Sequence, residues 1–283
     1  LTTAQLGALA SDQLQALNEG QIAGLTTTQI AAFATDDLNQ LSATQFGYLT
    51  TRQIAGLSTE QVANLESTDL QALSAGQIAA LTTAGIVALD STDIGNLSAT
   101  QVAGMTTAQV RAIETNELAA LTGNAFGALT SAQIGGLSTE QLGALASDQL
   151  NVLTASQLAG LTTAQIASLA TDDLNQLTAT QFQNLSTRQI AALGSDQVAG
   201  LESDDLMALG SAQIRALDTV DIAALDTADF ANLSGSQLSG MSSTQLRAID
   251  SADITAITPL AFSGLTSAQI ASLATEQIAA LGS

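Results

Sequence analysis

The sequence predicts an all-α solenoid, a superhelix of short capped helices with one helix in each eight-residue repeat. Three observations predict this fold. The 283 residues parse from Leu1, without an insertion or deletion, into 35 octads and three further residues. Positions 1 and 6 of every octad are apolar, and position 5 is Gln in 23 octads, Asp in eight and Glu in one. Position 2 is Ser or Thr in 20 octads, which is typical of a helix cap.

The octad spacing excludes an uninterrupted helix and an uninterrupted strand. At about 100° per residue, a step of eight residues rotates the apolar pair by about 80°, so a continuous helix would have no apolar stripe. Positions 1 and 6 have opposite parity, so a strand would point them to opposite faces. Each octad must therefore contain its own break.

Positions 2 to 5 have the chemistry of a helix N-terminus. Position 2 is the N-cap and position 5 the N3 residue of a capping box, which makes positions 1 and 6 a hydrophobic staple. The single proline, Pro259, falls at position 3, the N1 position where proline is favoured. All 26 acids lie at positions 2 to 5, where the helix dipole favours negative charge. We therefore expect a helix of about one and a half turns in each octad, closed by the small residue at position 8.

Such short helices are marginal alone, so we expect positions 1 and 6 to be buried in a core that stacked octads share. The Gln row is expected to bond the N-cap amide and to form a hydrogen-bonded ladder between successive octads. Octads without Ser or Thr at position 2 recur at steps of three and four, which predicts about 3.4 octads per turn. At the spacing of packed helices, the turns add up to a rod of roughly 80 to 100 Å.

A second, longer period lies on top of the octads. Residues 34–41 recur at 170–177, an offset of 136 residues, so long repeats span 1–136 and 137–272 and a third copy starts at 273. We expect residues 1–283 to form a single continuous solenoid that is a segment of a longer array.

The composition excludes most classes of chemistry. There is no His, Cys, Lys or Trp, which removes His- and Cys-based nucleophiles, Cys/His zinc sites, disulfides and Schiff-base lysines. A formal net charge of -21 repels nucleic acid, which is bound through Lys and Arg. No apolar run approaches the roughly 20 residues of a membrane span. We expect no enzyme, no resident cofactor, no nucleic-acid partner and no membrane span.

Paired acids come closest to a functional constellation. Helix capping and surface charge explain them, and the alternative is Ca²⁺, which takes six to eight oxygen ligands. The candidate ligands for weakly bound Ca²⁺ are Asp36, Asp37, Asp90, Asp93, Asp172, Asp173, Asp226, Asp229, Asp250 and Asp253. Two further pairs are Asp204/Asp205 and Asp218/Asp221.

Hydroxyl and guanidinium side chains form two further sets. Thr pairs at positions 2 and 3, such as Thr26/Thr27 and Thr162/Thr163, are expected to cap helices, and a hydroxyl-rich surface for a glycan is the alternative. Five arginines occupy positions 4 and 7, where pairing with surface acids is expected: Arg52, Arg111, Arg188, Arg215 and Arg247.

The motif L-[ST]-x-x-Q-[IVL]-x-[AG], as in LTTTQIAA at 25–32, resembles the octapeptide-repeat tracts of giant bacterial surface or secreted adhesin-like exoproteins. The resemblance extends over all 35 octads. It implies an extracellular or cell-surface location and a structural or adhesive role.

The expected function is therefore that of a structural or adhesive segment, acting as a stiff acidic spacer or as a fibre subunit. Its expected partners are further copies of itself, neighbouring segments of the same long protein, or a surface glycan. The alternative is a module that binds Ca²⁺ or a glycan through the acidic or Thr-rich face.

Overall fold

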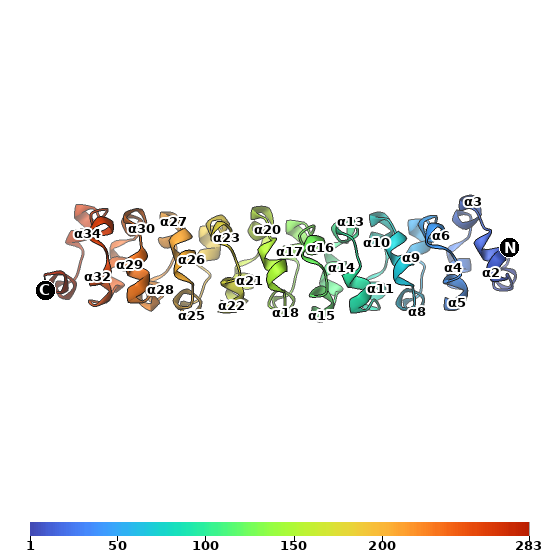
Figure 1. The fold of residues 1–283 in the computed structure, drawn as a ribbon, viewed down its shortest axis with the longest axis horizontal. Coiled ribbons are helices and arrows are strands. Elements are labelled where there is room, and N and C mark those ends of the chain that lie inside the picture. The colour runs from blue at the N-terminus through green and yellow to red at the C-terminus, as the bar shows by residue number, and fades with distance from the viewer. Residues whose placement is uncertain (283) are drawn as a thin grey trace. The chain divides into compact units, whose positions relative to one another are not determined.

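The chain folds as short α-helices joined by tight connections, and the predicted all-α solenoid is confirmed (Figure 1). The computed structural model describes residues 1–282, and no strand occurs among them. One helix lies in each of the 35 octads. The chain divides into two compact units, Leu1–Val152 (unit 1) and Leu153–Ser283 (unit 2).

Unit 1 contains the first 19 helices, each of four to six residues. They are α1 (Thr3–Leu6), α2 (Ser11–Gln15), α3 (Glu19–Ala23), α4 (Thr27–Ala31), α5 (Thr35–Leu38), α6 (Ala43–Gly47), α7 (Thr51–Ile54), α8 (Thr59–Ala63), α9 (Ser67–Ala72), α10 (Ala75–Ala80), α11 (Thr83–Val87), α12 (Ser91–Gly95), α13 (Ala99–Gly104), α14 (Thr107–Ala112), α15 (Thr115–Leu118), α16 (Gly123–Phe126), α17 (Ser131–Gly135), α18 (Thr139–Leu142) and α19 (Ser147–Asn151).

Unit 2 contains the remaining helices of the described residues, each of four to seven residues. They are α20 (Ala155–Gly160), α21 (Thr163–Ser168), α22 (Thr171–Leu174), α23 (Ala179–Asn184), α24 (Thr187–Ile190), α25 (Ser195–Ala199), α26 (Ser203–Ala208), α27 (Ser211–Ile214), α28 (Thr219–Ala224), α29 (Thr227–Asn232), α30 (Gly235–Gly240), α31 (Ser243–Ala248), α32 (Asp253–Ala256), α33 (Pro259–Phe262), α34 (Ser267–Ala271) and α35 (Thr275–Leu281).

The helices begin where the octad chemistry predicts. Each starts at octad position 3, except α32, which starts at position 5. In α7 the Thr50 hydroxyl accepts a hydrogen bond from the Gln53 backbone N–H at 3.3 Å, and the Gln53 Oε1 accepts one from the Thr50 N–H at 2.7 Å. This reciprocal pair is the predicted capping box. Pro259 is the N1 residue of α33, as its position in the octad predicts.

The two apolar positions form the core of each unit. Position 6 is completely or almost completely buried in the interior octads, as for Ile78 and Ile94 in unit 1 and Ile190 and Ile222 in unit 2. Position 1 is buried almost as deeply, at 3% exposure for both Leu97 and Leu225 in mid-array. Burial of this pair supplies the apolar area that a helix of four to seven residues cannot bury within itself.

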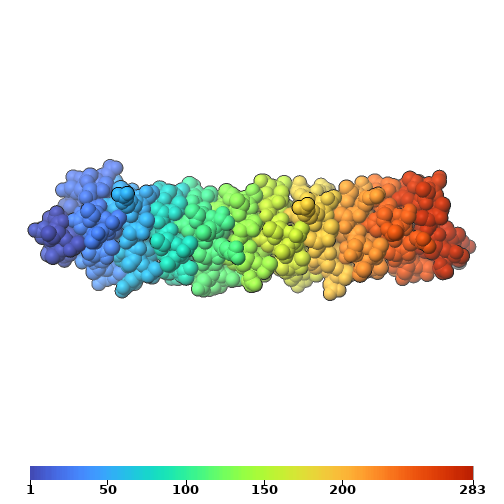
Figure 2. Space-filling model, turned by 180° about the vertical axis from the view of Figure 1, so that it is seen from behind, coloured from blue at the N-terminus to red at the C-terminus, as the bar shows by residue number. Residues whose placement is uncertain are grey.

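Within each unit, a helix packs against the helix three octads further along the chain, so α6, α9, α12 and α15 lie on successive turns. The colour changes gradually along each unit in Figure 2, because the octads that touch one another are close in sequence. At some octads the turns approach so closely that position 8 has no room for a side chain. A Cβ added to Gly104 in α13 would lie 2.6 Å from the Ala75 Cβ in α10.

Truncation of one position-6 side chain is expected to weaken the core of its own turn. Ile94→Ala removes a fully buried side chain, so the free energy of unfolding should fall by about 2 to 5 kcal/mol. Val87→Ala, at a side chain that is 46% exposed, is the control and should change it by less than about 0.5 kcal/mol. Urea titration followed by circular dichroism measures both, and equal effects would contradict the assignment of position 6 to the core.

Candidate functional site

The side chain at octad position 5 connects successive turns of the coil. In unit 1, Gln53 is 2% exposed, and its Nε2 donates to the Ile22 and Leu25 carbonyls, each at 2.7 Å. These carbonyls lie 31 and 28 residues earlier in the chain, at the junction between the octads four and three repeats back. The amide therefore caps its own helix with Oε1 and binds the preceding turn with Nε2.

This two-ended arrangement, here called the Gln bridge, recurs in both units. Nε2 reaches the same pair of carbonyls in unit 1 from Gln45, Gln53, Gln61, Gln77, Gln101, Gln109, Gln133, Gln141 and Gln149. In unit 2 it does so from Gln189, Gln197, Gln213, Gln237, Gln245, Gln269 and Gln277.

The expected ladder between successive octads was therefore wrong in its partners. The amide bonds backbone carbonyls of the preceding turn and not the Gln of the next octad. A junction between octads three and four repeats back agrees with the predicted average of about 3.4 octads per turn. The Oε1 half of the bridge persists without a Ser or Thr cap, since Ala146 N–H still donates to Gln149 Oε1 at 2.9 Å.

Acids at position 5 interrupt the Gln bridge because a carboxylate has no N–H to donate. Asp93, Asp221 and Asp229 keep only the capping half, accepting the N-cap N–H through Oδ2 at 3.4, 2.9 and 3.1 Å. Glu117 has the length of Gln and accepts the Glu114 N–H through Oε2 at 3.3 Å. Its second oxygen cannot donate to the carbonyls of the preceding turn as a Gln amide would.

Asp69 in α9 and Asp205 in α26 keep neither half of the bridge. They are 3% and 5% exposed, and in each the Oδ2 atom is buried without a hydrogen-bond partner. Burial, followed by the negative charge of Glu66, raises the pKa of Asp69 to about 6. Burial, followed by Glu202 and Asp204, raises the pKa of Asp205 to about 6. These are the least satisfied carboxylates in residues 1–282.

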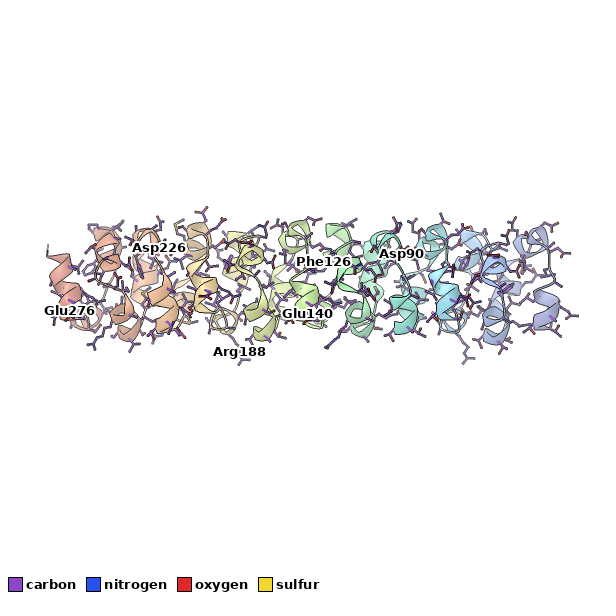
Figure 3. All side chains as sticks on the ribbon, turned by 90° about the horizontal axis from the view of Figure 1, so that it is seen from below. Asp90, Phe126, Glu140, Arg188, Asp226 and Glu276 are labelled. Atoms are coloured by element: carbon purple, nitrogen blue, oxygen red, sulfur yellow. The ribbon has the colours of Figure 1, made fainter. Side chains whose placement is uncertain are left out.

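Half of the ten predicted Ca²⁺ ligands make capping hydrogen bonds. The Asp90 carboxylate accepts the N–H groups of Thr92 and Asp93 at 2.8 and 2.9 Å. Asp226, which occupies the same place in unit 2, accepts the Asp229 N–H at 2.9 Å (Figure 3).

The other predicted ligands include one further capping residue and several exposed or half-buried residues. Asp250 caps through the N–H groups of Ala252 and Asp253 at 2.7 and 2.9 Å, and hydrogen bonding lowers its pKa. Asp253 accepts the Thr227 hydroxyl at 2.6 Å. Asp36 and Asp172 are exposed, while Asp37 and Asp173 are half-buried. Within residues 1–282 no three acids converge in a group that could hold a metal ion.

Charge is distributed unevenly over the stacked helices. In unit 2, the column α21, α24, α27, α30, α33 contains no acid, while the column α20, α23, α26, α29, α32, α35 contains eight. In unit 1, the column α1, α4, α7, α10, α13, α16 contains no acid either. We call these two stacks the acid-free columns.

The expected pairing of the arginines with surface acids was wrong, because within residues 1–282 no ion pair is formed by Arg52, Arg111, Arg188, Arg215 or Arg247. Arg52 lies in α7 and Arg188 in α24, so both belong to acid-free columns. Neither guanidinium forms an ion pair with a described residue, and the Arg188 side chain extends outward from its helix (Figure 3).

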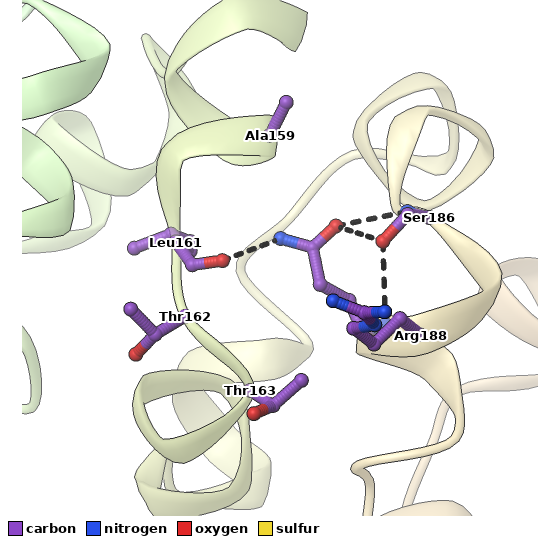
Figure 4. A pocket seen from close by; sticks show the side chains of 7 residues that line it. Ala159, Leu161, Thr162, Thr163, Ser186 and Arg188 are labelled. Carbon is purple, nitrogen blue, oxygen red and sulfur yellow. Dashed lines mark hydrogen bonds between the residues drawn. The ribbon is translucent and has the colours of Figure 1, made fainter.

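Each of these two arginines lines a surface cavity. In unit 2 the cavity has a volume of about 540 Å³ and lies between α21 and α24 (Figure 4). Its lining is Ala159, Leu161, Thr162, Thr163, Ser186, Arg188 and Gln189. The matching cavity of unit 1, about 320 Å³, is lined by Ala23, Leu25, Thr26, Thr27, Thr50, Arg52 and Gln53. Hydroxyl groups and an unpaired guanidinium thus meet at equivalent places in both units.

Comparison with protein families finds one match, to a family model described as the ALTTAQ repeat. It matches residues 30–67, 62–99, 86–123, 110–154, 166–203, 198–235 and 246–283. The search of curated proteins finds no match. Among the described residues, no helix has both the length and the apolarity needed to cross a membrane.

Acidification is expected to stabilise the chain between pH 7.5 and pH 5 in metal-free buffer. The folded pKa of Asp69 and Asp205 lies near 6, above the ordinary value of 3.8, so their protonation favours the folded state. This contribution is complete below about pH 3.8 and is lost as the pH rises through about 6. Thermal unfolding should therefore have a higher midpoint at pH 5. In Asp69→Asn/Asp205→Asn the difference between pH 5 and pH 7.5 should shrink, and an unchanged difference would contradict this assignment.

Glu117→Gln is expected to restore a Gln bridge. The new amide would donate to the Ile86 and Leu89 carbonyls, 31 and 28 residues earlier, and stability should rise by about 1 kcal/mol for each hydrogen bond formed. Glu60→Gln makes the same chemical change at an exposed side chain and is the control. Urea unfolding at pH 7.5 measures both variants. Equal stability changes would show that charge removal, and not the bridge, is responsible.

Proposed function

The chain belongs to the ALTTAQ repeat family, and we propose that it is a structural or adhesive segment of an extracellular or cell-surface protein. Its role is that of a stiff acidic spacer or a fibre subunit. The observation that carries the proposal is the Gln bridge, which ties each turn to the preceding one in a buried position throughout both units. We propose no catalytic role and no resident cofactor.

Stiffness follows from the placement of the hydrogen bonds. To bend or separate two turns, the chain must break buried amide–carbonyl bonds and expose the position 1 and 6 side chains at the same time. Because every turn repeats the same bonds, resistance is distributed along the array as a sum of nearest-neighbour terms. The net charge of -21 adds a repulsion that salt screens, so it is secondary to these contacts.

Small-angle X-ray scattering tests the spacer role. The maximum dimension should lie near the roughly 80 to 100 Å expected from stacked helices, and it should be the same in 0.15 M and 1 M NaCl. A salt-dependent dimension would show that charge repulsion alone extends the chain. Electron micrographs of the same sample distinguish the two forms of the proposal, since isolated short rods support a spacer and long uniform filaments support a fibre subunit. Surface labelling of intact source cells with an antibody against the chain tests the location.

A second candidate function, glycan binding, is favoured by the two equivalent cavities. The unpaired Arg188 guanidinium can hold a carboxylate through two parallel hydrogen bonds, and the neighbouring Thr163 hydroxyl can bond a sugar hydroxyl. The ligand class is therefore an acidic saccharide. Titration with a uronic-acid oligosaccharide should give heat that Arg52→Gln/Arg188→Gln abolishes. Arg215→Gln/Arg247→Gln removes the same charge outside the cavities and should bind as the parent does, whereas equal losses in both variants would reject the cavities as the site.

A further inference from the structure

Asp69 and Asp205 occupy equivalent places in the two units. They lie 136 residues apart in the matching segments LESTDLQAL at 65–73 and LESDDLMAL at 201–209. Both carboxylates are more than nine-tenths buried with an unpartnered Oδ2. A buried charged oxygen without a partner is costly and calls for an occupant that supplies positive charge or a donor.

The neighbouring octads show what surrounds each carboxylate. At every Gln bridge, Nε2 lies 2.6 to 3.3 Å from carbonyl oxygens 28 and 31 residues earlier. If Asp69 keeps the register of these bridges, the carbonyls opposite it are those of Leu38 and Leu41, 31 and 28 residues earlier. Aspartate is one methylene shorter than glutamine and ends in an acceptor. In this register, the space that a glutamine amide nitrogen would fill lies between the Asp69 Oδ2 and the carbonyl oxygens of Leu38 and Leu41. None of the three can donate to the others.

We propose that Asp69 binds a Ca²⁺ ion together with the Leu38 and Leu41 carbonyls, and that Asp205 binds a second one together with the carbonyls of Leu174 and Leu177. The ion takes the place of the missing amide nitrogen and satisfies all three oxygens, whereas a bridging water has only two hydrogens to donate. Water and the N-cap carboxylate, Glu66 or Glu202, complete the six to eight oxygens that Ca²⁺ accepts. Mg²⁺ fits less well because it requires a near-ideal octahedron at 2.0–2.1 Å and dehydrates reluctantly.

The charges around each site favour a cation. Glu66 makes no capping hydrogen bond, so its carboxylate remains available. Helices α6 and α12 pack against α9. The octad of α6 contains no charged residue, and the only charged residues in the octad of α12 are Asp90 and Asp93. The octad that holds Leu38 adds two more acids and no base.

The surroundings of Asp205 repeat this pattern. Glu202 makes no capping hydrogen bond either. The octad itself adds Asp204, the helix α23 is uncharged, and α29 brings Asp226 and Asp229. The octad that holds Leu174 likewise contributes two acids and no base. Each pocket of negative charge thus lacks any compensating arginine, and desolvation of the aspartate raises its pKa in the absence of a bound cation.

The Asp69 site differs from the acid pairs selected from sequence, whereas Asp205 belongs to one of them, Asp204/Asp205. In pairs such as Asp90/Asp93, the first carboxylate is already occupied by backbone N–H groups of its own helix. Asp69 follows Glu66 at the same spacing at which Asp93 follows Asp90, and sequence reasoning selected only pairs of aspartates, so it did not select Asp69. A buried carboxylate oxygen without a hydrogen-bond partner, visible only in the structure, separates Asp69 from the acids that cap their helices.

Calorimetric titration of the whole chain with CaCl₂ at pH 7.5 tests the proposal. The expected result is two sites per chain, with a dissociation constant of about 10⁻⁴ to 10⁻³ M for partly preformed oxygen sites of this kind. Asp69→Gln and Asp205→Gln should each remove one site, and the double variant should remove both. Glu60→Gln/Asp196→Asn removes one exposed acid from each unit and should still bind two ions.

Thermal unfolding gives an independent readout. Ca²⁺ at 10 mM should raise the midpoint of the parent and of the control by about 5 to 9 °C, and MgCl₂ should raise it less. Asp69→Gln/Asp205→Gln should start from a higher midpoint in EDTA and respond little to Ca²⁺. No effect of Ca²⁺ on the parent, or an equal effect on the double Gln variant, would overturn the proposal. Stabilisation by acid without any response to Ca²⁺ would also overturn it and make the proton the occupant.

Discussion

The interaction on which the rest of this structure depends is the pair of hydrogen bonds made by the amide at octad position 5. One end of the amide starts a helix by capping its first N–H, and the other end binds carbonyls of the turn before. In Gln53, for example, both ends are satisfied in a side chain that is almost fully buried. A buried amide that makes only one of its two sets of hydrogen bonds is costly. The residue at which each helix starts and the alignment of each turn with the preceding turn are therefore fixed together.

An acid at the same position carries a negative charge and cannot donate the hydrogen bond that a Gln amide makes to the preceding turn. Asp221 and Asp229 retain the cap and lose the bond to the preceding turn, and burial raises the pKa of both carboxyls. Asp69 and Asp205 lose both. The acidic octads are therefore local weak points in an otherwise uniform array. An external cation or proton acts most strongly at such points, because elsewhere the side chain already satisfies the backbone.

A spacer with these properties combines Gln bridges between successive turns with a few acidic octads at which a bound cation or proton can change stability. The Gln bridges stabilise each turn independently of remote parts of the chain, as is general for solenoids. If Ca²⁺ occupies the Asp69 and Asp205 sites, stability in a calcium-rich medium exceeds that in a calcium-poor one without any change of fold. The acid-free columns, with Arg52 and Arg188, are stacks of helices without negative charge in each unit.

The sequence by itself determined the octad, the start of each helix at position 3, the buried positions 1 and 6 and the approximate number of octads per turn. These features are local, because the capping residues and the apolar spacing within eight residues are enough to predict them. Only the tertiary structure decided what the Gln amide binds, which acids lie unpartnered and that Arg52 and Arg188 face no acid. Each of those outcomes depends on residues about 25 to 31 positions away, brought together by the pitch of the coil, and no spacing within one octad encodes that meeting.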